Sequence, residues 1–137
     1  MVDKSKYALL LFALFLSVVA ALEKKEDSIT FKARVIVDNK LPSGQNFTIH
    51  CKSKDDDLDV HTILPNDIYT FHFYNNFWGT TLFFCRVTTS YGQGVYDLYK
   101  FKRDKKRCSV CVYRVTKDGV YAVSTEPGRY DFIFKWE

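Results

Sequence analysis

The feature that most constrains the fold of this sequence is an alternation of apolar and polar residues with a period of two. In residues 69–74, three aromatic side chains point to one side of an extended segment, while Thr70, His72 and Tyr74 point to the other. Because successive side chains of a strand face opposite sides of a sheet, the pattern predicts β-strands. The same spacing recurs in residues 33–37, 47–51, 111–115 and 130–136. Residues 22–137 lack any clear 3.6-residue helical period.

Short turn motifs separate these apolar segments. Proline and glycine occur in residues 41–44 and 126–128, and a Gly-Gln-Gly motif lies within 91–94. Asp118-Gly119 between two apolar segments predicts a hairpin with a type I′ turn. The spacing of the segments predicts an all-β domain, a small antiparallel β-sandwich of about eight strands. A small closed barrel is the alternative.

The first 21 residues have the composition of a secretory signal peptide. Lys4 and Lys6 precede an apolar stretch over residues 7–22, and Val19-x-Ala21 supplies small residues for cleavage. The stretch is shorter than the roughly 20 residues that a membrane span requires. We therefore predict a cleaved signal at 1–21 and one domain at 22–137, with a secreted, extracellular product that is not inserted in a membrane. A signal anchor is the alternative.

Four cysteines follow the predicted signal: Cys51, Cys85, Cys108 and Cys111. An even number in an exported chain of this length predicts two disulfides. Positions 108 and 111 of an extended strand face opposite sides, so we expect each to bond separately to Cys51 or Cys85, in a pairing left open. A redox pair would require a βαβ context and a zinc site a second close cysteine pair, so we expect no cofactor and no metal.

Three motifs resemble those of the plant self-incompatibility S-protein homologue family. They are the segment from His50-Cys51-Lys52 to Asp57-Leu58 with His61, the segment from Gly79 to Cys85, and the segment from Cys108 to Tyr113; Asn39 lies in a matching opening segment. The resemblance covers about Val35 to Trp136. It implies a secreted β-sandwich that acts as an extracellular signalling ligand for a plasma-membrane receptor or another extracellular protein, in some members in pollen–pistil recognition.

The resemblance also implies that variable loops carry recognition. These loops are residues 52–59, 75–78, 90–94 and 102–107, and the candidate recognition residues are Lys54, Asp55, Asp56, Asp57, Asp59, Phe77, Trp78, Lys105, Lys106 and Arg107. The family usually has glycine where this chain has Asp59. Because glycine reaches positive φ more easily than aspartate, this departure affects the expected turn.

Residues 100–107 are the most charged segment, with six basic residues in eight. We expect an exposed loop or strand edge in which Lys105, Lys106 and Arg107 contact a partner, either a cell-wall polyanion or an acidic receptor loop. The whole chain has a net charge of +4, and removal of Asp3, Lys4 and Lys6 with the signal leaves about +3. This charge is small for a nucleic-acid-binding protein, and we expect no nucleic-acid partner.

The acidic segment around Asp55 and the aromatic pair Phe77 and Trp78 each have a structural interpretation as well as a functional one. Asp55 and its neighbours could suggest calcium, but Val60 and Asn66 occupy the glycine and glutamate positions of an EF-hand loop, so we expect a solvated turn. For Phe77 and Trp78 we expect packing over the end of the sandwich. An exposed contact with a sugar or a protein is the alternative.

The sequence does not predict an enzyme. A ribonuclease-like mechanism would require two of His50, His61 and His72 to converge on one phosphate, and nothing in their spacing brings them together. Asn46-Phe47-Thr48 is a glycosylation sequon, and export would make Asn46 available. We therefore expect a secreted signalling ligand, with a secreted cell-wall or glycan-binding module as the alternative.

Overall fold

The computed structural model describes residue 8, residues 10–16 and residues 32–137. Residues 10–16 are helical, and no helix among the described residues is long and apolar enough to cross a membrane. Most of the predicted signal peptide lies outside the described residues. Residues 1–31 and 32–137 form separate units, and the second is described below by itself.

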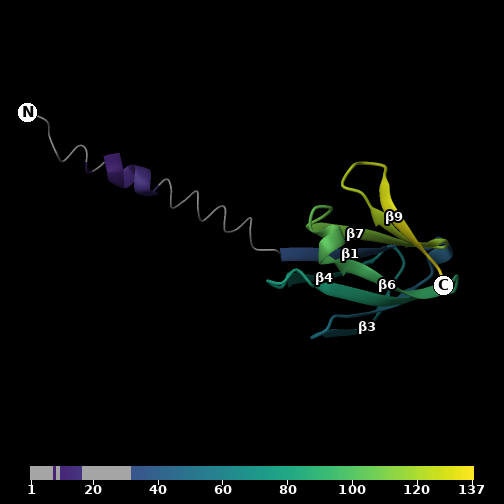
Figure 1. The fold of residues 1–137 in the computed structure, drawn as a ribbon. Helices are drawn as coiled ribbons and strands as arrows, with labels where there is room; N and C mark the ends of the chain where they lie inside the picture. Colours follow the sequence, from purple (N-terminus) through teal and green to yellow (C-terminus); the bar gives the residue numbers. More distant parts are fainter. Residues whose placement is uncertain (1–7, 9, 17–31) are drawn as a thin grey trace, which may run out of the picture. The chain divides into compact units, whose positions relative to one another are not determined.

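Residues 32–137 form two β-sheets that face each other across a hydrophobic core (Figure 1). The first sheet has the order β4-β1-β7-β8-β9 and the second β3-β2-β5-β6. The strands are β1 (Lys32–Asn39), β2 (Phe47–Lys52), β3 (Asp57–Ile63), β4 (Ile68–Tyr74), β5 (Leu82–Thr88), β6 (Gln93–Lys100), β7 (Val110–Thr116), β8 (Gly119–Val123) and β9 (Tyr130–Lys135). The two sheets have separate edge strands, so the predicted sandwich is confirmed over the barrel.

Three local features differ from the sequence-based expectation. β1 pairs with β7 in parallel, with Val35 opposite Cys111, whereas every other strand pair is antiparallel. A four-residue helix, α2 (Phe101–Asp104), follows β6, and a 3-10 helix, η1 (Pro42–Gly44), follows β1. Both are too short to produce a helical period. The β7–β8 hairpin is confirmed, but not its type I′ turn, because neither central residue, Lys117 or Asp118, has positive φ.

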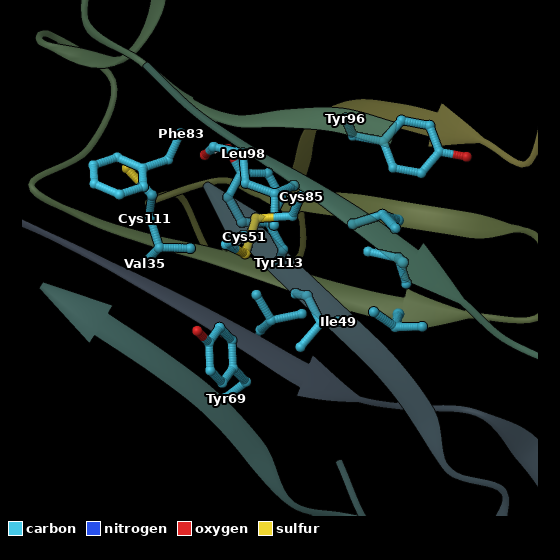
Figure 2. Close-up of a cluster of buried hydrophobic side chains, with 14 of the residues drawn as sticks. Val35, Ile49, Cys51, Tyr69, Phe83, Cys85, Tyr96, Leu98, Cys111 and Tyr113 are labelled. Atoms are coloured by element: carbon cyan, nitrogen blue, oxygen red, sulfur yellow. A yellow bond between two sulfur atoms is a disulfide. The ribbon is translucent and has the colours of Figure 1, made fainter. Parts of the chain in front are cut away.

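The core lies between the inward faces of the two sheets. Cys51 of β2 and Cys85 of β5 are directly opposite each other and form a disulfide inside it. Figure 2 shows this disulfide among the buried side chains of Ile49, Leu98 and Tyr113. These inward positions follow the alternation in the sequence, because every second residue of β1, β2 and β7 is buried. The core therefore holds the strand ends in fixed positions.

Strand direction places the connecting loops at two ends of the sandwich, as in other proteins of this architecture. The α2 end carries residues 53–56, 75–81, 101–109 and 124–129. The C-terminal end carries residues 40–46, 64–67, 89–92 and 117–118 together with Glu137. Glu137 closes this end, since its amide donates to the Gln93 carbonyl at 3.0 Å.

Candidate recognition surface

The α2 end brings together three of the four loops expected to carry recognition. Residues 53–56, 75–81 and 101–107 all connect strands at this end. The fourth predicted loop, residues 90–94, lies at the C-terminal end, where Gln93 and Gly94 belong to β6. A single partner at the α2 end could therefore contact three of the predicted loops but not the fourth.

A cleft of about 580 Å³ opens at the α2 end. The turn between β2 and β3 forms one wall, and the end of β4 with the start of β5 forms the other. Its lining residues are Ser53, Lys54, Asp55, Asp56, His72, Phe73, Tyr74, Asn76, Thr80, Thr81, Leu82, Phe83 and Phe84. The cleft thus combines an apolar, partly aromatic wall with a charged wall that includes three predicted recognition residues.

The turn at residues 53–56 is held by its own hydrogen bonds. The Ser53 amide donates to the Asp56 carbonyl at 2.8 Å, and the Asp56 amide donates to the Ser53 hydroxyl at 3.1 Å. Lys54, Asp55 and Asp56 are exposed. The interpretation as a solvated turn therefore holds for these residues. Among the described residues, no three histidine, cysteine, aspartate or glutamate side chains gather as a metal site.

Asp57 and Asp59 lie in β3 instead of the predicted loop. The Asp57 carboxylate is 2.6 Å from His50 Nε2 and 3.9 Å from Lys52 Nζ. The hydrogen bond with His50 lowers the pKa of Asp57, and the Asp59 amide, which donates to the same carboxylate at 3.0 Å, lowers it further. Asp57 therefore stabilises the start of β3 through these hydrogen bonds, and its carboxylate is less available to a partner than those of Asp55 and Asp56.

Asp59, where the resemblance led us to expect glycine, has a positive φ. Its φ is +64°, in the left-handed region that side chains other than Asn and Asp rarely occupy. Its amide donates to the Asp57 carboxylate. Aspartate is among the residues that tolerate this conformation, so the left-handed turn forms here without glycine.

The histidines do not form the pair that a hydrolase would require. His50 lies opposite Val60 and His61 opposite Ile49, so the two imidazoles point to opposite faces of their sheet. His61 Nε2 is 2.7 Å from the Leu58 carbonyl, and its ring lies 4.8 Å from that of Tyr69. These contacts hold His61 within its own sheet region and against Tyr69. His72 instead lines the cleft.

The expectation that Phe77 and Trp78 pack over the end of the sandwich is wrong. Phe77 is 91% exposed and Trp78 81% exposed, and their rings form a T-shaped contact with centroids 5.4 Å apart. The reason is local: Asn76 accepts from the Thr80 amide and donates to the Thr80 hydroxyl, which tightens the loop beneath them. Phe77 and Trp78 therefore lie exposed at the tip of the loop, where the alternative interpretation, an exposed contact with a sugar or a protein, needs them to be.

The basic segment is only partly exposed, contrary to the sequence-based expectation. Its central acid, Asp104, is fully buried and accepts hydrogen bonds from both neighbouring arginines. Arg103 donates to both oxygens of this carboxylate and Arg107 donates to Oδ1, and Arg107 also pairs with Asp131 at 3.0 Å. With a side chain only 13% exposed, Arg107 is a structural residue and is not the recognition residue that the sequence predicted.

The environment of the buried ion cluster shifts the pKa values of Asp104 and Tyr113. Burial raises the pKa of Asp104, but hydrogen bonds from Arg103, the Lys100 amide and Arg107 outweigh it and hold that pKa below its ordinary value. Burial also raises the pKa of Tyr113 to about 12. The Tyr113 hydroxyl donates to the Leu98 carbonyl and accepts from Arg107 at 3.0 Å. The cluster therefore joins α2 to β6 and β7.

All four lysines of the basic segment are exposed: Lys100, which ends β6, and Lys102, Lys105 and Lys106 of the α2 region. Two of them, Lys105 and Lys106, are predicted recognition residues. Lys105 Nζ lies 5.5 Å above the ring of Phe101. The helical turn explains the division, because Arg103 and Arg107, four residues apart, share the side of the buried Asp104, whereas Lys102, Lys105 and Lys106 reach solvent.

The number of disulfides is as predicted, but their pairing is not. Cys51 bonds to Cys85, and Cys108 bonds to its near neighbour Cys111. Cys108 precedes β7 and follows the turn after α2, so the chain is not extended between the two cysteines. Their Cα atoms are 5.2 Å apart, within bonding range. The argument from opposite faces of a strand therefore does not apply to this pair.

Asn46 and Asn39 lie in different environments. Asn46 is exposed at the C-terminal end, and its glycosylation stays a prediction. Asn39 is buried and was not predicted as structural: its side-chain amide donates to the carbonyls of Gln45, Ile63 and Leu64. The available signal was its position two residues after Val37, which continues the inward side of the alternation in β1.

Comparison with known protein families identifies the family of this chain. The plant self-incompatibility protein S1 family matches residues 34–136, which include both sheets and all three loops of the α2 end. The chain belongs to this family. The S1-family match confirms the resemblance that the cysteine and acidic motifs suggested.

Individual relatives in the S1 family come from Arabidopsis thaliana. S-protein homolog 6 is 31% identical over 136 residues, covering 93% of this chain and 97% of the relative. S-protein homolog 24 is 38% identical over 91 residues, covering 64% of this chain and 59% of the relative.

A solved structure of SPH (self-incompatibility protein homologue) proteins has the same fold, with a TM-score of 0.56 at 15% identity. The likeness covers 78% of this chain and 96% of the other. The SPH proteins are described as a widespread family of small, highly stable, secreted plant proteins. The predicted secretion of this chain agrees with that description.

Proposed function

We propose that this protein is a secreted extracellular ligand that binds a cell-surface protein through its α2 end. The observation that carries the proposal is the gathering of three loops at that end, two of which, residues 53–56 and 75–81, line one cleft. The loops present exposed groups of different kinds: the charges of Lys54, Asp55 and Asp56, and the rings of Phe77 and Trp78. Such a mixture favours selective binding, since a partner must match both charge and shape.

The scaffold supports this role because it fixes the loops before binding. The turn at 53–56 follows β2, whose Cys51 is bonded to Cys85. The aromatic loop contacts α2, which the buried Asp104 attaches to the core. Loops held in place lose little conformational freedom on binding, and this lowers the free-energy cost of association.

A cell-wall or glycan-binding module is the second candidate. The exposed side chains of Lys102, Lys105 and Lys106 favour it, because exposed lysines attract polyanions such as pectin. The exposed Trp78 offers a ring for contact with a sugar. The two candidates differ in whether the bound component is a protein of the cell surface or a polysaccharide of the wall.

The test uses the full chain, produced through a plant secretory pathway and purified from the medium. Labelled protein is added to pollen and leaf protoplasts, which lack walls, and to isolated wall material. We expect saturable binding to protoplasts that surface proteolysis abolishes. The combined variant Lys54→Gln, Asp55→Asn and Asp56→Asn should weaken this binding by about tenfold or more, because it removes the charges of one wall of the cleft.

A matched control is Lys40→Gln with Asp67→Asn and Asp118→Asn, which makes the same change in net charge with exposed residues at the C-terminal end. It should bind as the parent does. Binding confined to wall material and released by pectinase would overturn the ligand proposal in favour of the second candidate.

A further inference from the structure

The aromatic tip of the α2 end is exposed to a degree that the fold does not require. Phe77, at 91%, and Trp78, at 81%, are the most exposed large hydrophobic side chains among the described residues, and Tyr74 beside them is 67% exposed. Within the described part of the chain, no acceptor lies within hydrogen-bond distance of the Trp78 indole N–H. Single exposed apolar residues are ordinary, whereas a group of large aromatic residues at one tip marks an interaction site.

Basic side chains flank this tip. Gly79, the residue after Trp78, lies so close to the Phe101 ring that an added Cβ would be 2.8 Å from it, and the Phe101 amide donates to the Thr81 carbonyl. Lys105 covers the same Phe101 ring, which places α2 directly against the loop. On the other side, Lys32 Nζ lies 5.8 Å above the ring of Tyr74.

The three lysines of the α2 region are free to meet an anion. Among the described residues, no carboxylate oxygen lies within 4.0 Å of the ammonium groups of Lys102, Lys105 or Lys106. The arginines of the same segment are instead directed inward to Asp104. The positive charge at the surface thus comes from lysine side chains, which are long enough to reach past the protein surface.

We propose that the α2 end docks on an anionic phospholipid surface. Phe77 and Trp78 enter the headgroup region, and Lys102, Lys105 and Lys106 contact the lipid phosphates. Tryptophan and tyrosine are enriched where proteins meet the membrane–water interface, and lysines near an anionic leaflet add electrostatic attraction. This inference goes beyond the proposed function, because it requires no receptor.

The geometry favours a bilayer over a sugar. The rings of Phe77 and Trp78 are inclined at 85°, so they do not form a flat platform on which one sugar ring could lie across both. They also stand at the tip of a loop and are not among the residues that line the cleft. A convex aromatic tip suits insertion between lipid headgroups, which part around it.

The acids of the same end limit the attraction. Asp55 and Asp56 are exposed on the wall of the cleft and reduce the net positive charge of the α2 end. We therefore expect reversible docking that weakens as salt is added, since screening acts most strongly on exposed charges. Neutralising these two acids should not weaken docking, and this separates it from receptor binding through the cleft.

The experiment measures co-sedimentation of the full secreted protein with phosphatidylcholine vesicles, with and without about one third phosphatidylglycerol. We expect binding to the anionic vesicles only, lost at high salt. Brominated lipids should quench the tryptophan fluorescence of the parent but not of Trp78→Phe, because Trp136 lies at the C-terminal end. That outcome would place Trp78 in the headgroup region.

Two sets of variants test the residues. Phe77→Ala with Trp78→Ala, and separately Lys102→Gln with Lys105→Gln and Lys106→Gln, should each weaken vesicle binding by about tenfold or more. The matched control, Lys40→Gln with Lys117→Gln and Lys135→Gln, makes the same change in net charge with exposed lysines at the C-terminal end. It should bind as the parent does. Circular dichroism establishes that each variant is folded.

Three outcomes would overturn the proposal. They are equal weakening by the control triple, unchanged quenching in Trp78→Phe, and binding to soluble polygalacturonate without any binding to anionic vesicles. The last would assign the lysines to an acidic polysaccharide. Because the vesicles contain no protein, failure here leaves the receptor proposal standing, and the vesicle assay tests lipid docking independently of the protoplast assay.

Discussion

At the scale of single residues, Asp104 shows how one buried charge determines which of its neighbours reach solvent. Its carboxylate is fully buried and accepts hydrogen bonds from Arg103, Arg107 and the Lys100 amide. Arg107 extends the cluster to Asp131 and Tyr113. A buried ion pair is costly to break, because removal of one partner leaves the other charge in a poorly solvated site.

We predict that Asp104→Asn lowers the free energy of unfolding by about 3 kcal/mol. The folded-state pKa of Asp104 is depressed, so its contribution is complete above the ordinary aspartate pKa and is lost as the pH falls through the folded value. Urea unfolding from pH 7 down to pH 2 should therefore show a smaller acid-induced loss in the variant than in the parent. Asp55→Asn, at an exposed position, is the control, and equal effects of the two substitutions would refute the prediction.

Residue-level prediction from sequence succeeded where a local pattern determines the environment. Exposure of Lys54, Asp55 and Asp56 follows from three charges in a short turn. The inward direction of Arg107 does not, because it depends on Asp104 and Asp131, which only the folded chain brings together. The exposure of Phe77 and Trp78 likewise contradicts the usual burial of large aromatic side chains, and only the loop geometry reveals it.

At the scale of elements, the two disulfides constrain different parts of the chain. Cys51–Cys85 joins β2 to β5 within one sheet and closes a segment with a sequence separation of 34. Cys108–Cys111 has a sequence separation of 3 and fixes the entry into β7. Since a disulfide stabilises mainly by restricting the unfolded chain, the longer segment contributes more.

We predict that replacing both Cys51 and Cys85 by alanine costs about 4 kcal/mol, and replacing both Cys108 and Cys111 about 2 kcal/mol. Chemical denaturation of the two double variants, each compared with the oxidised parent, measures the difference. The cavity left between the sheets by the first substitution adds to its cost. A larger loss from the Cys108 and Cys111 variant would show that the entry into β7 governs stability.

The strands themselves were predictable because alternation is a local property. Residues 33–37 and 111–115 were recognised as strands, but their parallel pairing was not, since it depends on the path of the chain between them. β3 was missed because its sequence, Asp57–Ile63, is mostly polar and exposed. The helix α2 has one turn, too few residues for a hydrophobic period.

At the scale of the whole molecule, the two ends of the sandwich differ in chemistry. The α2 end carries the cleft, the aromatic tip and the exposed lysines, whereas the C-terminal end carries the sequon at Asn46. A glycan at Asn46 would leave the α2 end uncovered. Its bulk would instead restrict contacts of the C-terminal end.

We predict that Asn46→Gln does not change binding to protoplasts. In contrast, Lys54→Asn with Asp56→Thr creates a sequon on the exposed turn, and the added glycan should abolish that binding by covering the cleft. The measurement compares the two variants after secretion, with a shift in electrophoretic mobility on glycosidase treatment as proof of occupancy. Undiminished binding by the occupied turn variant would exclude the cleft as the contact surface.

The parallel pairing of β1 with β7 has a consequence for biogenesis. Val35 faces Cys111, so the central pair of the five-stranded sheet joins an early part of the chain to a late one. β1 cannot complete its hydrogen bonds until β7 has been synthesised and has crossed the translocon. Contacts so distant in sequence slow folding. Until residues 110–116 are available, β1 can pair only with β4, and its other edge stays open.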